Sequence, residues 1–240
     1  MCELQDLTNN KMFGEFWTEC TFSSLPYYRA TVVEAVEAIA KQGYKWWKKE
    51  TTDFDGIKLE LVDILHFTLS DFLRRHKDMR VVVAKYEENS ARSIPIHQIG
   101  RFNENIDCFD GEGFEPIAIS PTISRMLSLD SLTFNDLCEQ LIYASLREGY
   151  SDFPTLTLLF EYMGMSPDEV YLKYLAKNTL NHFRDDNGQK EGTYFRIWDG
   201  KDDDQVLAAY LNENSCVVRS DLYSFLTDAY TTSLHKAHKI

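Results

Sequence analysis

The chain has 240 residues, of which 44% are hydrophobic and 13% aromatic, and its net charge is −13 at pH 7. This composition supports a substantial core and excludes an intrinsically disordered chain. The negative charge excludes non-specific binding to nucleic-acid phosphates, so a phosphate substrate would require metal ions and a few local cations. The length fits a single domain over residues 1–240.

The sequence shows no signal peptide and no apolar run long enough to cross a membrane. The cysteines are odd in number, widely spaced and without a C-x-x-C pair: Cys2, Cys20, Cys108, Cys138 and Cys216. Neither a disulfide framework nor a zinc site is therefore indicated. We expect a cytoplasmic protein that has no membrane partner and no nucleic-acid partner.

The first strong signal is an acidic pair, Glu34 and Glu37, in a segment with helical patterning. The spacing i, i+3 directs both carboxylates from one face of a helix. The neighbouring side chains are apolar: Val32, Val33, Val36 and Ile39. The pair therefore lies on an otherwise apolar surface.

A second acidic pair, Glu60 and Asp63, lies in segment 57–73, which is apolar on nearly every side. A helix of this kind is buried in a core or in an interface. Ionised carboxylates are costly there unless a positive group pairs with them. Two helices that each carry such a pair can face each other and form a four-carboxylate cage, whose hard oxygen ligands suit Mg²⁺.

An alternative is that these acids form ordinary surface ion pairs with Lys41, Lys45 or Lys58. Solvated acidic helix faces are common, so a single pair would favour this alternative. Two pairs so close in the sequence, one of them within an apolar run, favour the cage. We therefore predict a metal site formed by four residues: Glu34, Glu37, Glu60 and Asp63.

The segment from about 76 to 122 carries charged residues, glycines and prolines, and is predicted to be an irregular insertion with a possible short strand at 79–84. Helical patterning returns at 127–146, where Thr133 and Asp136 can cap a helix, and again near Pro154. Two short helices are expected at the end of the chain, at 204–211 and 220–238.

The clearest helix start is the run Ser166-Pro167-Asp168-Glu169, in which serine can cap and proline suits the first turn. The helix is predicted to end at Asn187-Gly188. Lys177, Asn181 and Arg184 share one face of it, so two cations and an amide project together. A solvated last turn explains this spacing equally well, because cations favour a helix C-terminus.

The two acidic pairs, the run Lys45-Trp46-Trp47-Lys48 between them and the segment 177–203 resemble the dimeric all-α dUTPases. The resemblance implies an all-α helical bundle core with an irregular inserted segment, a homodimer, and two or more Mg²⁺ ions in each active site. It also implies six phosphate-binding residues: Lys177, Asn178, Asn181, Arg184, Asn187 and Lys190.

The resemblance further implies contacts with the nucleoside. Gln5 and Asn9 match an opening segment that lies beside the nucleoside in that family. Trp46 or Trp47 is the candidate for contact with the base, with core packing as the alternative, and His66 is expected close to the sugar.

The implied activity is hydrolysis of dUTP to dUMP and pyrophosphate, and of dUDP to dUMP and phosphate, by a metal-activated water that attacks the α-phosphate. Glu37 is the candidate to orient or deprotonate this water, with Glu34 beside it. The apolar excess of segment 57–73 also predicts a homodimer with a large apolar interface.

Two positions depart from the family pattern: Gln189 stands where an aromatic residue is usual, and Tyr44 where Trp is usual. The Gln189 departure keeps a dCTP or mixed dCTP/dUTP pyrophosphohydrolase open. A catalytically inactive helical dimer that binds nucleotides is a third alternative, which the four retained carboxylates argue against.

Overall fold

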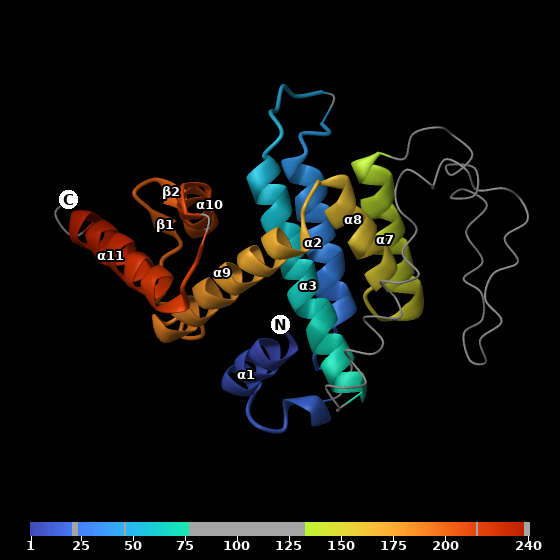
Figure 1. Cartoon of the computed structure of the whole chain (residues 1–240), viewed down its shortest axis with the longest axis horizontal. Helices are drawn as coiled ribbons and strands as arrows, with labels where there is room; N and C mark the ends of the chain where they lie inside the picture. Colours follow the sequence, from blue (N-terminus) through green and yellow to red (C-terminus); the bar gives the residue numbers. More distant parts are fainter. Residues whose placement is uncertain (21–23, 46, 77–132, 215, 238–240) are drawn as a thin grey trace, which may run out of the picture.

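The computed structural model describes the chain except for residues 21–23, 46, 77–132, 215 and 238–240. Within the described ranges it forms α-helices, a 3-10 turn and one two-stranded hairpin, which confirms the predicted all-α class (Figure 1). In chain order these are α1 (Cys2–Phe13), η1 (Trp17–Glu19), α2 (Tyr27–Lys41), α3 (Phe54–His76), α7 (Phe134–Glu148), α8 (Phe153–Tyr162), α9 (Pro167–Asp186), β1 (Ile197–Trp198), β2 (Lys201–Asp202), α10 (Asp203–Glu213) and α11 (Arg219–Ala237). The insertion predicted at about 76–122, with its possible strand at 79–84, lies outside the described residues apart from His76, the last residue of α3.

Helix α3 is the central element of the fold (Figure 1). Helices α1, α2, α8, α9 and α10 all pack against it. Its apolar side chains from Ile57 to Leu73 are buried, apart from the half-buried Phe67 and Phe72. Packing within one chain therefore accounts for the apolar run, and the run does not by itself support the predicted dimer interface.

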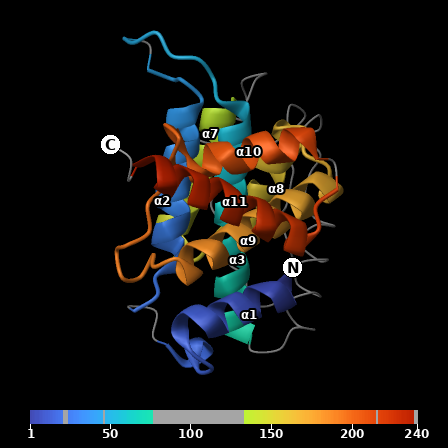
Figure 2. The ribbon, with the colours of Figure 1, turned by 90° about the vertical axis from the view of Figure 1, so that its left-hand side faces the viewer.

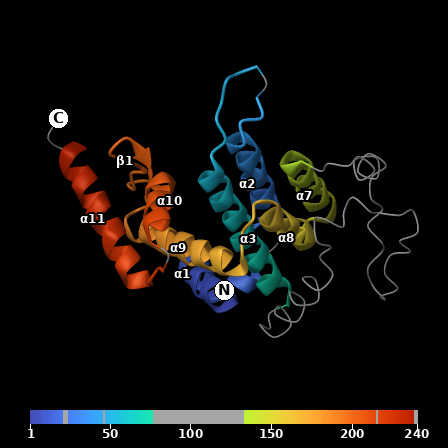
Figure 3. The ribbon, with the colours of Figure 1, turned by 45° about the horizontal axis from the view of Figure 1, so that its top comes forward.

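Among the described residues, the two larger of three hydrophobic clusters lie on opposite sides of α3. The first gathers buried side chains of α2, α3, α7 and α8. The second gathers side chains of α9, α10, α11 and the hairpin, and Leu59 of α3 joins it. Figures 2 and 3 show α10 and α11 on one side of α3, while α7 and α8 lie on the other.

The helix boundaries follow the local signals in the sequence. Thr133 and Asp136 form a reciprocal capping box at the start of α7, as predicted. At the start of α9 the Ser166 hydroxyl accepts a hydrogen bond from the Glu169 backbone N–H. The Glu169 carboxylate does not complete a box; it lies 2.8 Å from Lys58 Nζ on α3 instead.

The β1–β2 hairpin was not predicted. Its two-residue turn is Asp199-Gly200, and both residues have positive φ, 54° and 82°, as a tight turn between twisted antiparallel strands requires. The Trp198 ring is 2% exposed and packs against Phe183 of α9. This anchor fixes the hairpin beside the end of α9.

None of the helices in the described ranges is long and apolar enough to span a lipid bilayer.

Candidate active site

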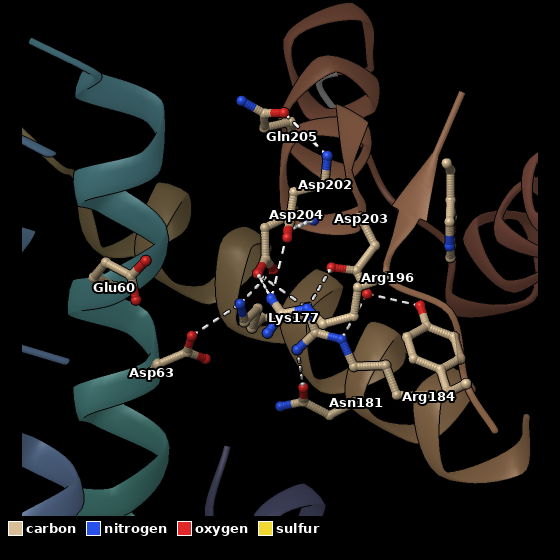
Figure 4. Close-up of polar contacts among 12 residues, drawn as sticks. Glu60, Asp63, Lys177, Asn181, Arg184, Arg196, Asp202, Asp203, Asp204 and Gln205 are labelled. Carbon is tan, nitrogen blue, oxygen red and sulfur yellow. Dashed lines mark hydrogen bonds and ion pairs between the residues drawn. The ribbon is translucent and has the colours of Figure 1, made fainter. Parts of the chain in front are cut away.

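A cavity of about 850 Å³ lies between α2 and α3 on one side and α9, the hairpin and α10 on the other. Its lining is dominated by acids, with eight carboxylates and four cations. The carboxylates belong to Glu34, Glu37, Asp53, Asp55, Glu60, Asp63, Asp202 and Asp204, and the cations to Lys41, Lys177, Arg184 and Arg196. Figure 4 shows the two faces of this cavity, with Glu60 and Asp63 on α3 facing the cations of α9.

The acidic wall is formed by α2 and α3. Ala35 and Ala38 are fully buried, and their small side chains suit close packing of the two helices. This packing brings Glu34 and Glu37 opposite Glu60, so that one carboxylate oxygen from each residue lies within 4.8 Å of the others. Three of the four predicted metal ligands therefore gather as the sequence indicated.

The three gathered carboxylates repel one another in a partly buried place. Burial raises the pKa of Glu34 to about 9, and the negative charges of Asp63, Glu60 and Glu37 add to the shift. Burial also raises the pKa of Glu60, against the opposing effect of Lys41. A group of acids in this state favours a bound cation, and their hard oxygen atoms fit Mg²⁺.

The Lys41 ammonium already supplies one positive charge to this wall. Its Nζ lies 2.5 Å from Glu60 Oε1, and the Lys41 side chain is 30% exposed. One of the alternative ion pairs considered from the sequence is therefore present, but it joins two helices rather than one helix surface.

Asp63 is not one of the three gathered acids, although its charge acts on Glu34 and Glu60. Its Oδ2 lies 2.8 Å from the Nζ of Lys177 on α9. The predicted cage of four carboxylates is therefore a group of three. The fourth, Asp63, lies one helical turn from Glu60 along α3 and is paired with Lys177.

The cationic wall is held together by acids at the start of α10. Lys177 Nζ also donates to Asp204 Oδ1, and Arg184 donates through Nε and Nη2 to both oxygens of Asp203 (Figure 4). Burial alone would lower the pKa of Lys177, but Asp63 and Asp204 raise it above its ordinary value. Lys177 is therefore a permanently charged buried cation.

The remaining phosphate candidates do not line the cavity. Asn178 is fully buried and donates to Thr8 Oγ1 of α1. Asn181 accepts a hydrogen bond from Arg184, and Asn187 donates to the Phe183 carbonyl at the end of α9. Lys190 is exposed, with its Nζ 3.0 Å from Asp185. Lys177 and Arg184 are thus the predicted cations that the structure brings into the cavity.

The nucleoside candidates meet in a buried polar seam between α1, α3 and α9. Gln5 and Asn9 both donate to the Ser70 hydroxyl of α3. Tyr174 of α9 donates to Gln5 and stacks on His66 with ring centroids 4.3 Å apart. Three of the predicted residues therefore lie together, although they come from segments far apart in the sequence.

This seam holds two buried acceptor atoms without a hydrogen-bond partner among the described residues, His66 Nε2 and Asn178 Oδ1. Burial lowers the pKa of His66 to about 4, so the ring is neutral at pH 7. Its Nδ1 lies 2.8 Å from the Val62 carbonyl and donates to it, which leaves Nε2 as an acceptor. Unpaired buried acceptors of this kind favour a ligand with hydrogen-bond donors.

The structure gives less information on the predicted contact of Trp46 or Trp47 with the base. Trp47 is 61% exposed on the connection between α2 and α3, so core packing does not explain it. Trp46 lies outside the described residues.

Sequence reasoning gave no individual role to three residues that line the cavity, Arg196, Asp202 and Asp204. Arg196 and Asp202 lie within the segment 177–203 that carries the family resemblance, and Asp204 directly follows it. Two sequence signals could have predicted the elements that hold them, the hairpin and the start of α10. The pair Asp199-Gly200 favours a hairpin turn, and Asp202 with Gln205 can form a capping box at a helix start.

A family model described as dUTPase matches residues 1–189. A search of the curated proteins found no match for the chain. The matched range contains both acidic pairs and the cations Lys177 and Arg184, and it ends before the hairpin.

Proposed function

The chain belongs to the dUTPase family, and we propose that it hydrolyses dUTP to dUMP and pyrophosphate, and dUDP to dUMP and phosphate, with Mg²⁺ as cofactor. One observation carries the proposal. Three clustered carboxylates face the buried cation Lys177 and the partly buried cation Arg184 across a single cavity. A triphosphate bound through metal ions needs carboxylates that hold the metal and cations that contact the phosphates directly.

The charge of the cavity supports a metal requirement. Its lining carries twice as many carboxylates as cations, so it repels a free polyphosphate. Divalent cations at the acidic wall would reverse this balance. Lys177 and Arg184 alone cannot, because both are already paired with aspartates.

Glu34, Glu37 and Glu60 are the residues that would hold Mg²⁺, with Asp63 as the fourth ligand in place of its pairing with Lys177. When bound, Mg²⁺ would lower the pKa of a water molecule and neutralise charge on phosphate oxygens. Glu37 is the most exposed of the three gathered carboxylates, which suits it to orient this water or accept its proton. Glu34 is more buried and suits a ligand role.

Lys177 and Arg184 would neutralise the charge that develops on the departing phosphates. Asp203 and Asp204 fix the direction of these two side chains before substrate arrives, so little reorganisation is needed during the reaction. The buried seam would take the nucleoside, because the unpaired acceptors of His66 and Asn178 match donors of a uracil ring and a deoxyribose.

We also propose a homodimer, on the basis of the family. Val33 and Val36 directly precede the two acids of α2 and are 52% and 51% exposed. These exposed apolar side chains are better candidates for an interface with a second chain than those of α3, which are already buried within one chain.

Pyrophosphate release with dUTP, dCTP and dTTP, each measured with Mg²⁺ and with chelator, tests the function. We expect turnover of dUTP that requires the metal and exceeds turnover of dCTP. Glu34→Gln should abolish it, whereas Glu161→Gln, at an exposed position on α8, should not. Faster turnover of dCTP would show that dCTP, not dUTP, is the preferred substrate. A folded protein that is inactive on all three nucleotides would overturn the proposal.

A further inference from the structure

Both acids that α3 contributes to the proposed metal site are paired with a lysine. Asp63 Oδ2 lies 2.8 Å from Lys177 Nζ, and Glu60 Oε1 lies 2.5 Å from Lys41 Nζ. Lys177 belongs to the cationic wall of the cavity. Lys41 belongs to α2, the helix that also carries the first acidic pair, and it lines the cavity. The acidic wall therefore contains a cation of its own.

The two lysines differ in how firmly they are held. The side chain of Lys177 is 3% exposed and is also paired with Asp204. The side chain of Lys41 is 30% exposed, and among the described residues Glu60 is its one ion-pair partner. A half-exposed ammonium with one partner can exchange that partner for water at little cost. Lys41 is therefore free to leave Glu60, whereas Lys177 is fixed.

The local structure directs Lys41 to Glu60. Lys41 is the last residue of α2, and its backbone carbonyl accepts a hydrogen bond from the Asp53 N–H just before α3. Its side-chain stem then crosses Gly56, where an added Cβ would lie 2.8 Å from Lys41 Cδ. Gly56 precedes Glu60 by one helical turn of α3. The missing side chain at Gly56 thus leaves the space through which the stem reaches Glu60.

A divalent ion at the same carboxylates would meet the Lys41 ammonium. Burial opposes the charge of this ammonium, but Glu60 raises its pKa above the ordinary value, so it is charged at neutral pH. Glu60 is 5% exposed, and one of its oxygens lies within 4.8 Å of an oxygen of Glu34 and of Glu37. Two cations on one carboxylate repel each other strongly in a partly buried place. Repulsion therefore opposes simultaneous binding of Lys41 and a metal ion to Glu60.

We propose that Lys41 and Mg²⁺ compete for the Glu60 carboxylate, so that Lys41 is a displaceable counter-ion that sets the Mg²⁺ concentration at which the site fills. The inference rests on the metal site of the proposed function. While Lys41 is paired with Glu60, its charge offsets the repulsion among the three carboxylates. When Mg²⁺ binds, the flexible four-carbon stem lets the ammonium move into solvent.

Calorimetric titration of Mg²⁺ into wild type, Lys41→Met and Lys58→Met in 0.15 M salt tests the competition. Methionine keeps an unbranched stem and removes the charge. Lys58 is the matched control, because it is a half-exposed lysine of α3 that is paired with Glu169 and does not line the cavity. We expect Lys41→Met to bind Mg²⁺ about three- to tenfold more tightly than wild type, and Lys58→Met to stay within about twofold of it, since salt screens distant charges.

Melting temperatures give a second measurement that a structural role would not reproduce. Lys41→Met should melt below wild type in chelator, because the three carboxylates have lost their counter-charge. In saturating Mg²⁺ the two proteins should melt together, because Lys41 is then unpaired in wild type. An equal loss in both conditions would assign Lys41 a structural role and overturn the inference, as would an unchanged affinity for Mg²⁺.

Amine labelling of the wild-type protein tests the inference without any variant, and so applies even if Lys41→Met does not fold. Reductive methylation followed by mass spectrometry measures how fast each lysine reacts. Methylation of Lys41 should become faster when Mg²⁺ replaces chelator, while methylation of Lys58 should not change. An unchanged rate at Lys41 would overturn the competition.

These measurements also separate the inference from the proposed function, because none of them uses a nucleotide. Competition in a protein that hydrolyses no nucleotide would support the inference and overturn the proposed activity. Equal Mg²⁺ affinity of wild type and Lys41→Met in an active dUTPase would overturn the inference alone. Absence of Mg²⁺ binding in both proteins would overturn the inference together with the metal site.

Discussion

The Lys177 ammonium lies 2.8 Å from the Asp63 carboxylate and joins α9 to α3 from inside the cavity. Because its side chain is almost completely buried, removing the cation leaves Asp63 and Asp204 facing each other without compensation. We predict that Lys177→Met lowers the free energy of unfolding by about 3–5 kcal/mol, measured by urea denaturation in chelator. Lys58→Met is the control, since the Lys58–Glu169 pair joins the same two helices but is more exposed, and it should cost less than about 1 kcal/mol. Equal losses in the two variants would contradict the buried pairing.

Metal binding should stabilise the fold. The clustered acids repel one another without a cation, so millimolar Mg²⁺ should raise the melting temperature. An unchanged midpoint would argue against the metal site.

Glu60→Gln separates a metal role from a structural role. The variant should lose the metal-dependent rise in melting temperature and most activity, yet stay as stable as wild type in chelator. The reason is that Lys41, its partner, is 30% exposed and can be solvated by water. A destabilised variant that retains full activity would assign Glu60 to the structure alone.

Gly188 should tolerate substitution less well than Gly192. Both have positive φ, 92° and 70°, which an alanine adopts only with strain. An added Cβ at Gly188 would also overlap Thr193 Oγ1, whereas at Gly192 it would meet no atom within 4 Å. We expect Gly192→Ala to cost about 1 kcal/mol and Gly188→Ala about 1–3 kcal/mol more, measured by denaturant unfolding. Equal effects would show that Thr193 moves away freely.

His182 should make the fold sensitive to acid. Burial, with Arg219 and Lys11 nearby, lowers its pKa from 6.5 to about 4. The unfolded chain therefore takes up this proton first as pH falls, and stability is lost between about pH 6.5 and 4. Melting temperatures at pH 7 and 5 should differ less in His182→Gln than in wild type. His235→Gln, at an exposed position near the end of α11, should keep the wild-type difference.

Light scattering during size-exclusion chromatography tests the assembly. A homodimer would give twice the chain mass of 27.9 kDa at micromolar concentration. A single-chain mass would refute the dimer while leaving the cavity within one chain intact.

The sequence predicted the elements whose signals are local. The apolar segment 57–73 corresponds to α3, and Ser166 begins α9 as its capping signal indicated. Helical spacing likewise placed Glu34 beside Glu37, and Lys177 on one face with Arg184. These relationships need only the period of a helix, which a sequence displays directly.

The sequence could not show which elements face each other. The pairing of Asp63 with Lys177 joins helices separated by the whole insertion, and no local pattern encodes it. The same limit applies to the apolar run of α3. An apolar helix fits a core or a dimer interface equally well until α9 and α10 are seen to cover its second side.

Asn178 shows how helical spacing and family resemblance can disagree. It follows Lys177 directly, so the turn of the helix directs it about 100° away from the shared face of Lys177, Asn181 and Arg184. In the structure it points to Thr8 of α1 rather than into the cavity. Its phosphate role stays a prediction, and its position favours the nucleoside seam.

The two walls of the cavity are made at different times during synthesis. The acidic wall needs only α2 and α3, which are neighbours in the chain, whereas the cationic wall requires α9, the hairpin and α10. Contacts between sequence neighbours form with less loss of chain entropy than contacts that close long loops. An emerging chain therefore presents clustered carboxylates to the surrounding solution before Lys177 and Arg184 exist to balance them. Lys41 of α2 is the counter-charge that the acidic wall itself supplies at that stage. A divalent ion bound as proposed would therefore have its site on the emerging chain before the cationic wall exists.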